Sequence, residues 1–195
     1  MNVLTFDVET THKEKPNGQT TPLPFFGNDL VSIGYKWLDE TQVFYDCYYH
    51  STQPPSANAA EDFQTALNYA DILVGHNIKF DLMWIRECGF VYEGAIYDTM
   101  VAEYILSRSR HWPLGLADVA EKYGGTKKEK DLIKPYFKQG KTFYDIPWEI
   151  IVEYGVADVI VTEEIALKQL EIYGTTFEEL FNEQPRLDTD VASVS

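Results

Sequence analysis

Two carboxylates near the start of the chain, Asp7 and Glu9, have a spacing that lets them act together. Residues 3–8 are rich in β-branched and aromatic residues and predict a strand. Side chains alternate faces along a strand, so Asp7 and Glu9 point the same way, about 7 Å apart. Two carboxylates on one face of an apolar strand are costly unless something neutralises them, and a hard divalent cation does so. The alternative is a strand end that turns into solvent.

A third carboxylate, Asp81, follows residues 72–75, which predict a short buried strand. Asp81 falls in the first turn of a helix expected at residues 80–87, where the helix dipole also favours an acid for purely structural reasons. His76 lies between this strand and Asp81. It could bind a metal, but a lone histidine is more often a hydrogen-bonding neighbour. Asn77 could cap the helix or contact a substrate. This pattern alone leaves structural and functional roles open.

Tyr154 and Asp158 form the third pattern, in a segment with helical periodicity at residues 148–173. Residues four apart share one face of a helix, so this phenol and this carboxylate project together. An ordinary amphipathic helix also produces such a pair. Apolar neighbours such as Ile151 and Val161 indicate close packing, and an aspartate on the buried side of the helix needs a partner.

The elements that must position these groups are three strands followed by alternating strands and helices. Strand-like segments are residues 3–8, 30–38, 42–49, 72–75 and 95–97; helix-like segments are residues 58–70 (with Asn58 as the cap), 80–87, 99–106, 114–122 and 148–173. This order predicts an α/β fold, a mixed five-stranded sheet flanked by helices that is compatible with a ribonuclease H-like core. The connection at residues 10–29 is rich in Pro and Gly, and loops of this length are more often functional than idle.

The length of 195 residues fits one domain, and an apolar content of 45% is typical of a folded chain. We expect no membrane span, because no run of about 18 apolar residues exists. No basic region precedes an apolar stretch, so a secretory signal is not expected. Cys47 and Cys88 share no metal-binding spacing, and we interpret them as reduced thiols of a cytoplasmic protein.

The net charge of −15 would ordinarily argue against a nucleic-acid partner. The basic residues are concentrated, however: residues 122–141 hold seven lysines and two acids, which leaves nine basic and 29 acidic residues elsewhere. Bound Mg²⁺ would also supply positive charge locally. The lysine-rich segment is either a solvated loop or a phosphate-contacting one.

Taken together, the three patterns resemble the motifs of the DnaQ-like 3′–5′ exonucleases, in the subclass with a tyrosine in its third motif (DEDDy). The matching residues are 6–10, 76–81 and 154–158, with further similarity at 97–100 and 114–117. The similarity covers residues 1–175 and is greatest with the proofreading domain of phage family A DNA polymerases. Residues 176–195 are expected to be a helix end and a polar tail.

The resemblance implies two Mg²⁺ ions, replaceable by Mn²⁺, and a catalytic set of Asp7, Glu9, Asp81, Tyr154 and Asp158. Asp7 would bridge both ions. Glu9 and Asp158 would help to hold the ion that activates water, and Asp81 would support the other. Tyr154 would orient the attacking water, since a phenol with a pKa of about 10 is a poor general base.

The resemblance also implies a reaction: hydrolysis of single-stranded DNA from its 3′ end to nucleoside 5′-monophosphates, in proofreading, replication or repair. The residues expected to contact substrate are Thr10, His76 and Asn77. Unpaired bases could stack on Phe25, Phe26 or Trp112, although packing is the commoner role of such residues. Partners would be the DNA 3′ end and a DNA polymerase in cis or in trans. The location would be cytoplasmic, or the host cytoplasm if a phage encodes the chain.

Two alternatives stay open. The ribonuclease D group shares the tyrosine variant, so the chain could be an RNA-trimming 3′–5′ exoribonuclease. It could also be a non-catalytic module that docks on a polymerase, although such a module has no need of four converging carboxylates. The sequence indicates nothing about oligomeric state.

Overall fold

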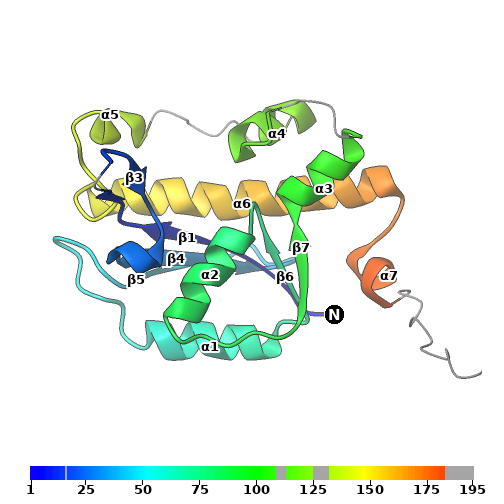
Figure 1. Cartoon of the computed structure of the whole chain (residues 1–195). Coiled ribbons are helices and arrows are strands. Elements are labelled where there is room, and N and C mark those ends of the chain that lie inside the picture. Colours follow the sequence, from blue (N-terminus) through cyan, green and yellow to red (C-terminus); the bar gives the residue numbers. More distant parts are fainter. Residues whose placement is uncertain (16, 109–112, 125–131, 183–195) are drawn as a thin grey trace, which may run out of the picture.

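The computed structural model describes residues 1–15, 17–108, 113–124 and 132–182. It contains a five-stranded sheet in the order β5-β4-β1-β6-β7 (Figure 1). β4 pairs antiparallel with β1 and β5, whereas β6 pairs in parallel with β1 and β7. The strands are β1 (Val3–Thr10), β4 (Leu30–Trp37), β5 (Phe44–Cys47), β6 (Ile72–Gly75) and β7 (Ala95–Asp98). The predicted ribonuclease H-like α/β fold with a mixed sheet is confirmed.

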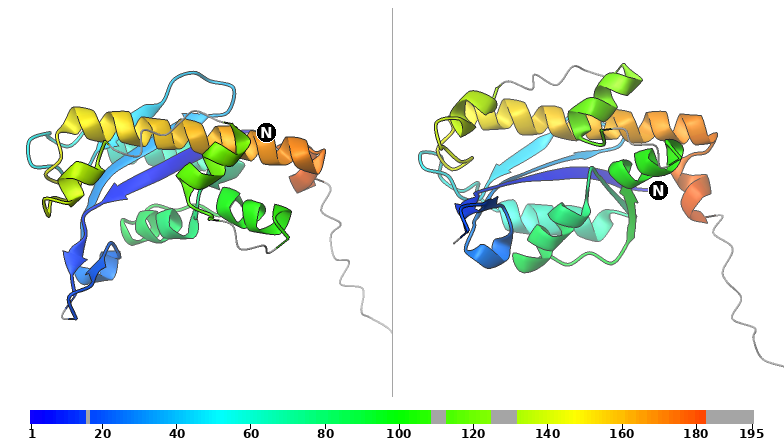
Figure 2. Two further views of the ribbon diagram at one scale, coloured as in Figure 1. Left: turned by 90° about the horizontal axis from the view of Figure 1, so that it is seen from above. Right: turned by 45° about the horizontal axis from the view of Figure 1, so that its top comes forward.

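Helices cover both faces of the sheet (Figures 1 and 2). The long helix α6 (Trp148–Tyr173) runs along one face, and α1 (Ala59–Tyr69) and α2 (Lys79–Glu87) cover the other. The remaining helices are α3 (Thr99–Leu106), α4 (Leu116–Tyr123), α5 (Lys134–Phe137), α7 (Phe177–Asn182) and the 3-10 helix η1 (Pro24–Phe26). Among the described residues, no helix combines the length and the apolar character needed to cross a membrane.

Alternation along β1 divides its side chains between these two layers. Leu4, Phe6 and Val8 are buried in the core shared with α1 and α2. The side chains between them therefore face α6 on the other side of the sheet. For this reason Asp7 and Glu9 lie under the long helix.

The connection after β1 contains structure that its composition does not predict. A two-stranded hairpin, β2 (Lys13–Glu14) with β3 (Thr20–Thr21), precedes η1. We call residues 11–15 and 17–29 the arm. It extends the chain beyond the end of β1, beside α2 (Figure 1).

Two details at the helix ends differ from the sequence-based expectations, the bonding of Asn58 and the separate helix α7 after α6. Asn58 occupies the N-cap position of α1, as predicted, but its φ is 60° and its side chain makes no capping bond. α6 ends where Gly174 adopts a left-handed φ of 69°. α7 then begins with Phe177, which is buried against Tyr97. Residues 176–195 are predicted to be a helix end and a polar tail; residues 177–182 instead form a separate packed helix, and residues 183–195 lie outside the described part.

Candidate active site

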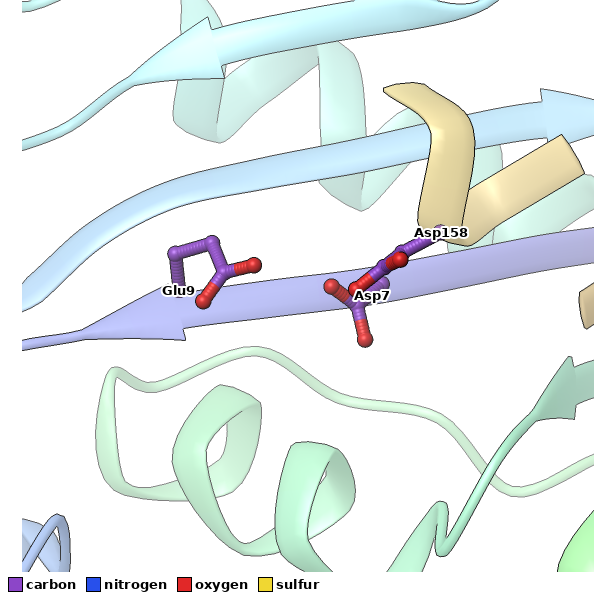
Figure 3. A group of neighbouring side chains, drawn as sticks. All are labelled: Asp7, Glu9 and Asp158. Atoms are coloured by element: carbon purple, nitrogen blue, oxygen red, sulfur yellow. The ribbon is translucent and has the colours of Figure 1, made fainter. Parts of the chain in front are cut away.

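Three of the four predicted acidic residues converge between β1 and α6 (Figure 3). One carboxylate oxygen from each of Asp7, Glu9 and Asp158 lies within 4.8 Å of the other two. Asp7 and Glu9 project from one face of β1, and Asp158 reaches them from α6. We call these three residues the acidic cluster.

The acidic cluster is largely withdrawn from solvent. Glu9 is 8% exposed, Asp158 is 4% exposed, and Asp7 is half-buried. Carboxylates this close repel one another strongly where little water screens them. Converging carboxylate oxygens are the ligands that Mg²⁺ prefers, so the donor set fits a hard divalent cation.

Asp81 lies beside the acidic cluster but is not one of its members. β6 pairs with β1 only as far as Thr5, so beyond that point β1 has an open edge. Asp81, buried in the first turn of α2, fills this edge by accepting a 3.2 Å hydrogen bond from the Val8 backbone N–H. Burial, and next the charge of Asp7, raise the pKa of Asp81 well above its usual value. The carboxyl therefore takes the place of a missing strand partner.

Tyr154 lies one helical turn before Asp158 and donates a hydrogen bond to its carboxylate. Burial raises the pKa of Tyr154 far above its usual value, and the nearby charges of Glu9 and Asp158 add to the shift. The phenol is therefore neutral and acts as a hydrogen-bond donor.

The three residues predicted to contact substrate differ in accessibility. Thr10 is buried at the bulge that ends β1. His76 uses both ring nitrogens, with Thr99 Oγ1 at 2.8 Å and the Leu114 carbonyl oxygen at 2.7 Å. It thereby joins the end of β6 to α3 and the segment before α4.

Asn77 has an exposed side chain and a left-handed φ of 59°. Its backbone N–H donates to Asp98 Oδ1 at 3.0 Å. The N-cap of α2 is Ile78, with no side-chain capping bond, so the suggestion that Asn77 caps this helix is wrong. Among these three residues, Asn77 is the one whose side chain is open to a substrate.

Tyr45 of β5 lies beside the acidic cluster, although the sequence patterns do not single it out. Its hydroxyl hydrogen bonds with Ser32 Oγ at 2.9 Å, and Ser32 is the β4 register partner of Glu9. Burial, followed by the charge of Glu9, raises the pKa of Tyr45 well above its usual value. The Tyr45 ring packs against Gly155 of α6. Gly155 is the one feature of the sequence that indicates this contact, because a glycine inside a packed helix suggests that another group approaches its backbone closely.

The described members of the predicted stacking and phosphate-contacting candidates are not part of the acidic cluster. Phe25 and Phe26 are exposed on η1, and Trp112 is outside the described residues. In the lysine-rich segment, Lys122 pairs with the buried Glu103, so this lysine has a structural role. Residues 125–131 of that segment are not described. The two cysteines are free, one of them buried and the other exposed.

A protein-family model described as 3′–5′ exonuclease matches residues 2–171. DNA polymerase I of Aquifex aeolicus (strain VF5) is 46% identical over 39 residues, which is 20% of this chain and 7% of that protein. The DNA polymerase of Bacillus phage SP01 is 30% identical over 102 residues, 51% of this chain and 11% of that protein. The matched segments therefore span about a tenth or less of these polymerases.

Similar solved structures include Brucella melitensis NrnC bound to pGG, with a TM-score of 0.60 and 15% identity over 99% of this chain and 90% of that one. NrnC with bound Mg²⁺ has a TM-score of 0.58, with the same identity and coverage. At this identity the likeness establishes a shared fold.

Proposed function

Because this chain belongs to the 3′–5′ exonuclease family, we propose that the acidic cluster is its catalytic centre and that single-stranded DNA 3′ ends are its substrate. The observation that carries this proposal is the convergence of Asp7, Glu9 and Asp158 from a strand and a helix about 150 residues apart. Such a buried set of acids is costly to keep unless a bound cation offsets its repulsion.

The cofactor in this proposal is Mg²⁺, with Mn²⁺ able to replace it. Asp7, Glu9 and Asp158 would hold one ion, and Asp7 with Asp81 would hold a second. When bound, two such ions lower the pKa of a water and neutralise charge on the phosphate and the departing 3′ oxygen. The structural likeness to NrnC with bound Mg²⁺ supports this choice of metal.

Tyr154 acts in this proposal by position rather than by ionising. Its hydroxyl hydrogen is given to Asp158, so the phenolic oxygen keeps lone pairs that can accept a hydrogen bond from a water. A water held in this way lies beside the acidic cluster. Because the pKa of Tyr154 is raised, the phenol keeps this role throughout the neutral range.

The remaining assignments concern the terminal nucleotide. Asn77 is the residue we assign to direct contact, because its side chain is exposed at the start of α2. We assign His76 and Thr10 to positioning the backbone around the site rather than to contact with the nucleotide, since the imidazole is held by two hydrogen bonds and the threonine is buried.

Similarity to two DNA polymerases favours DNA over RNA and favours proofreading beside a polymerase, joined to this chain or separate from it. Parallel assays on DNA and RNA oligomers of one sequence test the first point. Faster loss of the RNA would instead identify an exoribonuclease. Retention of a replicative polymerase from the source cell on immobilised protein tests the second, and no retained polymerase would count against it.

The exonuclease proposal is tested with a 5′-labelled single strand in Mg²⁺ and in EDTA. We expect a ladder of strands shortened from the 3′ end in Mg²⁺, and an intact strand in EDTA or with Asp7→Ala. An intact strand under all conditions would indicate a non-catalytic docking module. Cleavage that survives Asp7→Ala would place the chemistry elsewhere.

A further inference from the structure

A shallow pocket of about 620 Å³ lies on the outer face of α2 and includes none of the acidic cluster. Its walls come from the arm, α2 and β7, and they include Phe25, Leu82, Met83, Ile96, Lys79 and Arg86. Helical periodicity explains the composition of the α2 wall. The inward face of α2 carries Asp81, Trp84 and Ile85. The pocket-lining residues Lys79, Leu82, Met83 and Arg86 are spaced three or four positions apart, so they share the opposite face of the helix.

The arm holds the aromatic wall of this pocket in place. Phe25 is 66% exposed. The Trp84 indole N–H donates to the Pro22 carbonyl at 3.0 Å, which fastens the arm to α2. The Asn28 side-chain amide donates to the Leu23 carbonyl at 2.8 Å and fixes the turn before η1. A large aromatic side chain kept exposed on an anchored turn gives up the stabilisation of burial, which is typical of a binding surface.

The pocket carries balanced charge, because its lining includes two cations, Lys79 and Arg86, and two acids, Glu87 and Asp98. Lys79 and Arg86 form no ion pair with any other described residue, in a chain of net charge −15. The nearby Asp98 carboxylate already accepts hydrogen bonds from the backbone N–H groups of Asn77 and Met100, at 3.0 and 2.9 Å. The exposed ring and the apolar walls suit the flat bases of a nucleic acid. The two cations can contact its phosphates at a place where the charge is balanced, whereas most of this acidic chain would repel them.

α2 connects this pocket to the acidic cluster. Its first turn carries Asp81 against β1, and Asn77 lies just before it, while its outer face forms the pocket floor. We propose that the pocket binds an unpaired base of the substrate strand upstream of its 3′ end, with the base on Phe25 and the adjacent phosphate at Arg86. This inference rests on the proposed nuclease function.

Fluorescence anisotropy with a 5′-labelled single-stranded DNA in EDTA measures binding without cleavage. Phe25→Ala should raise Kd about five-fold or more, since stacking on an aromatic side chain contributes that much per base. Arg86→Gln should also raise Kd. It should reduce the slope of log K against log salt by about 0.7, the value for one lost phosphate contact on a single strand.

Tyr69→Ala and Lys168→Ala are the matched controls, because Tyr69 is an aromatic residue 67% exposed on α1 and Lys168 is exposed on α6, and neither lines this pocket. Both should bind within about two-fold of wild type, well below a stacking loss. The proposal that the pocket binds a base would be overturned if Kd were unchanged in Phe25→Ala and Arg86→Gln, or if the controls lost as much affinity as these two variants. Cleavage by wild type is assayed in parallel. If wild type cleaves DNA but neither pocket variant changes Kd, only the proposal for the pocket is rejected. If binding depends on the pocket but wild type does not cleave, only the proposed nuclease function is rejected.

Discussion

The ring of Tyr45 occupies the space that a side chain at Gly155 would need, with the Tyr45 hydroxyl nearest to the missing Cβ. A Cβ on Gly34 of β4 would likewise lie 2.8 Å from Tyr45 Cδ2. Two glycines, one on the sheet and one on α6, therefore form the slot for this tyrosine. Their lack of side chains lets α6 approach the sheet closely enough for Asp158 to reach Asp7.

Gly155→Ala tests this packing directly. In an open helix the change would stabilise the protein by about 1 kcal/mol. Here the added methyl group collides with Tyr45, so we expect a loss of about 1–3 kcal/mol in the free energy of unfolding and slower cleavage. Urea unfolding measures the first effect. The loss should be smaller in a Tyr45→Phe background, and a more stable Gly155→Ala protein would contradict the slot.

Tyr154→Phe removes the hydroxyl that donates to Asp158. We expect cleavage to slow by about ten- to a hundred-fold as the water loses its orientation, with Mg²⁺ affinity nearly unchanged. Single-turnover cleavage and calorimetric Mg²⁺ titration separate these effects. The raised pKa of Tyr154 also predicts that the wild-type rate shows no loss from phenol ionisation between about pH 8 and 10. A variant as fast as wild type would remove Tyr154 from the mechanism.

Asp81→Asn should raise stability in EDTA at neutral pH while it lowers cleavage. The pKa of Asp81 is raised in the folded state, so the folded protein holds a proton that the unfolded chain releases above its ordinary pKa of 3.8. Wild-type stability from this group is therefore present at low pH and declines as pH rises. Asparagine keeps an acceptor for the Val8 N–H without the charge. Urea unfolding at several pH values should show a gain on the order of 1 kcal/mol at pH 7 that shrinks toward pH 4. A loss at pH 7 would contradict the account.

Lys36 and Glu163 form a 2.6 Å ion pair that ties β4 to α6, with side chains only 8% and 14% exposed. Lys36→Ala should cost about 3–5 kcal/mol, because it leaves a carboxylate in a poorly solvated place. The matched control is Lys168→Ala, whose pair with Glu171 is more than half exposed and should contribute about 0–1 kcal/mol. Equal losses in the two variants would show that the inner pair does not hold α6.

The sequence predicts the long elements well, for physical reasons that individual residues make plain. The segment at residues 148–173 has helical periodicity, with Pro147 before it, and the structure has α6 at the same bounds. Alternation on β1 correctly places Asp7 and Glu9 on one face. These features depend on local spacing, which a sequence displays directly.

Other features depend on contacts between distant segments and cannot be predicted from local spacing. The Tyr45–Gly155 contact requires the register of β5 and the placement of α6. The position of Asp81 follows from β6 ending earlier than β1, which no local pattern shows. The hairpin in the arm has strands of two residues, too short to display a period.

The most direct test of the acidic cluster is a crystal structure grown with Mn²⁺ and a nucleoside monophosphate, in which anomalous scattering locates the metal. We predict an ion ligated by Asp7, Glu9 and Asp158, with the phosphate of the nucleotide beside it. Metal bound only elsewhere, with these three side chains uncoordinated at saturating Mn²⁺, would contradict the proposed catalytic centre.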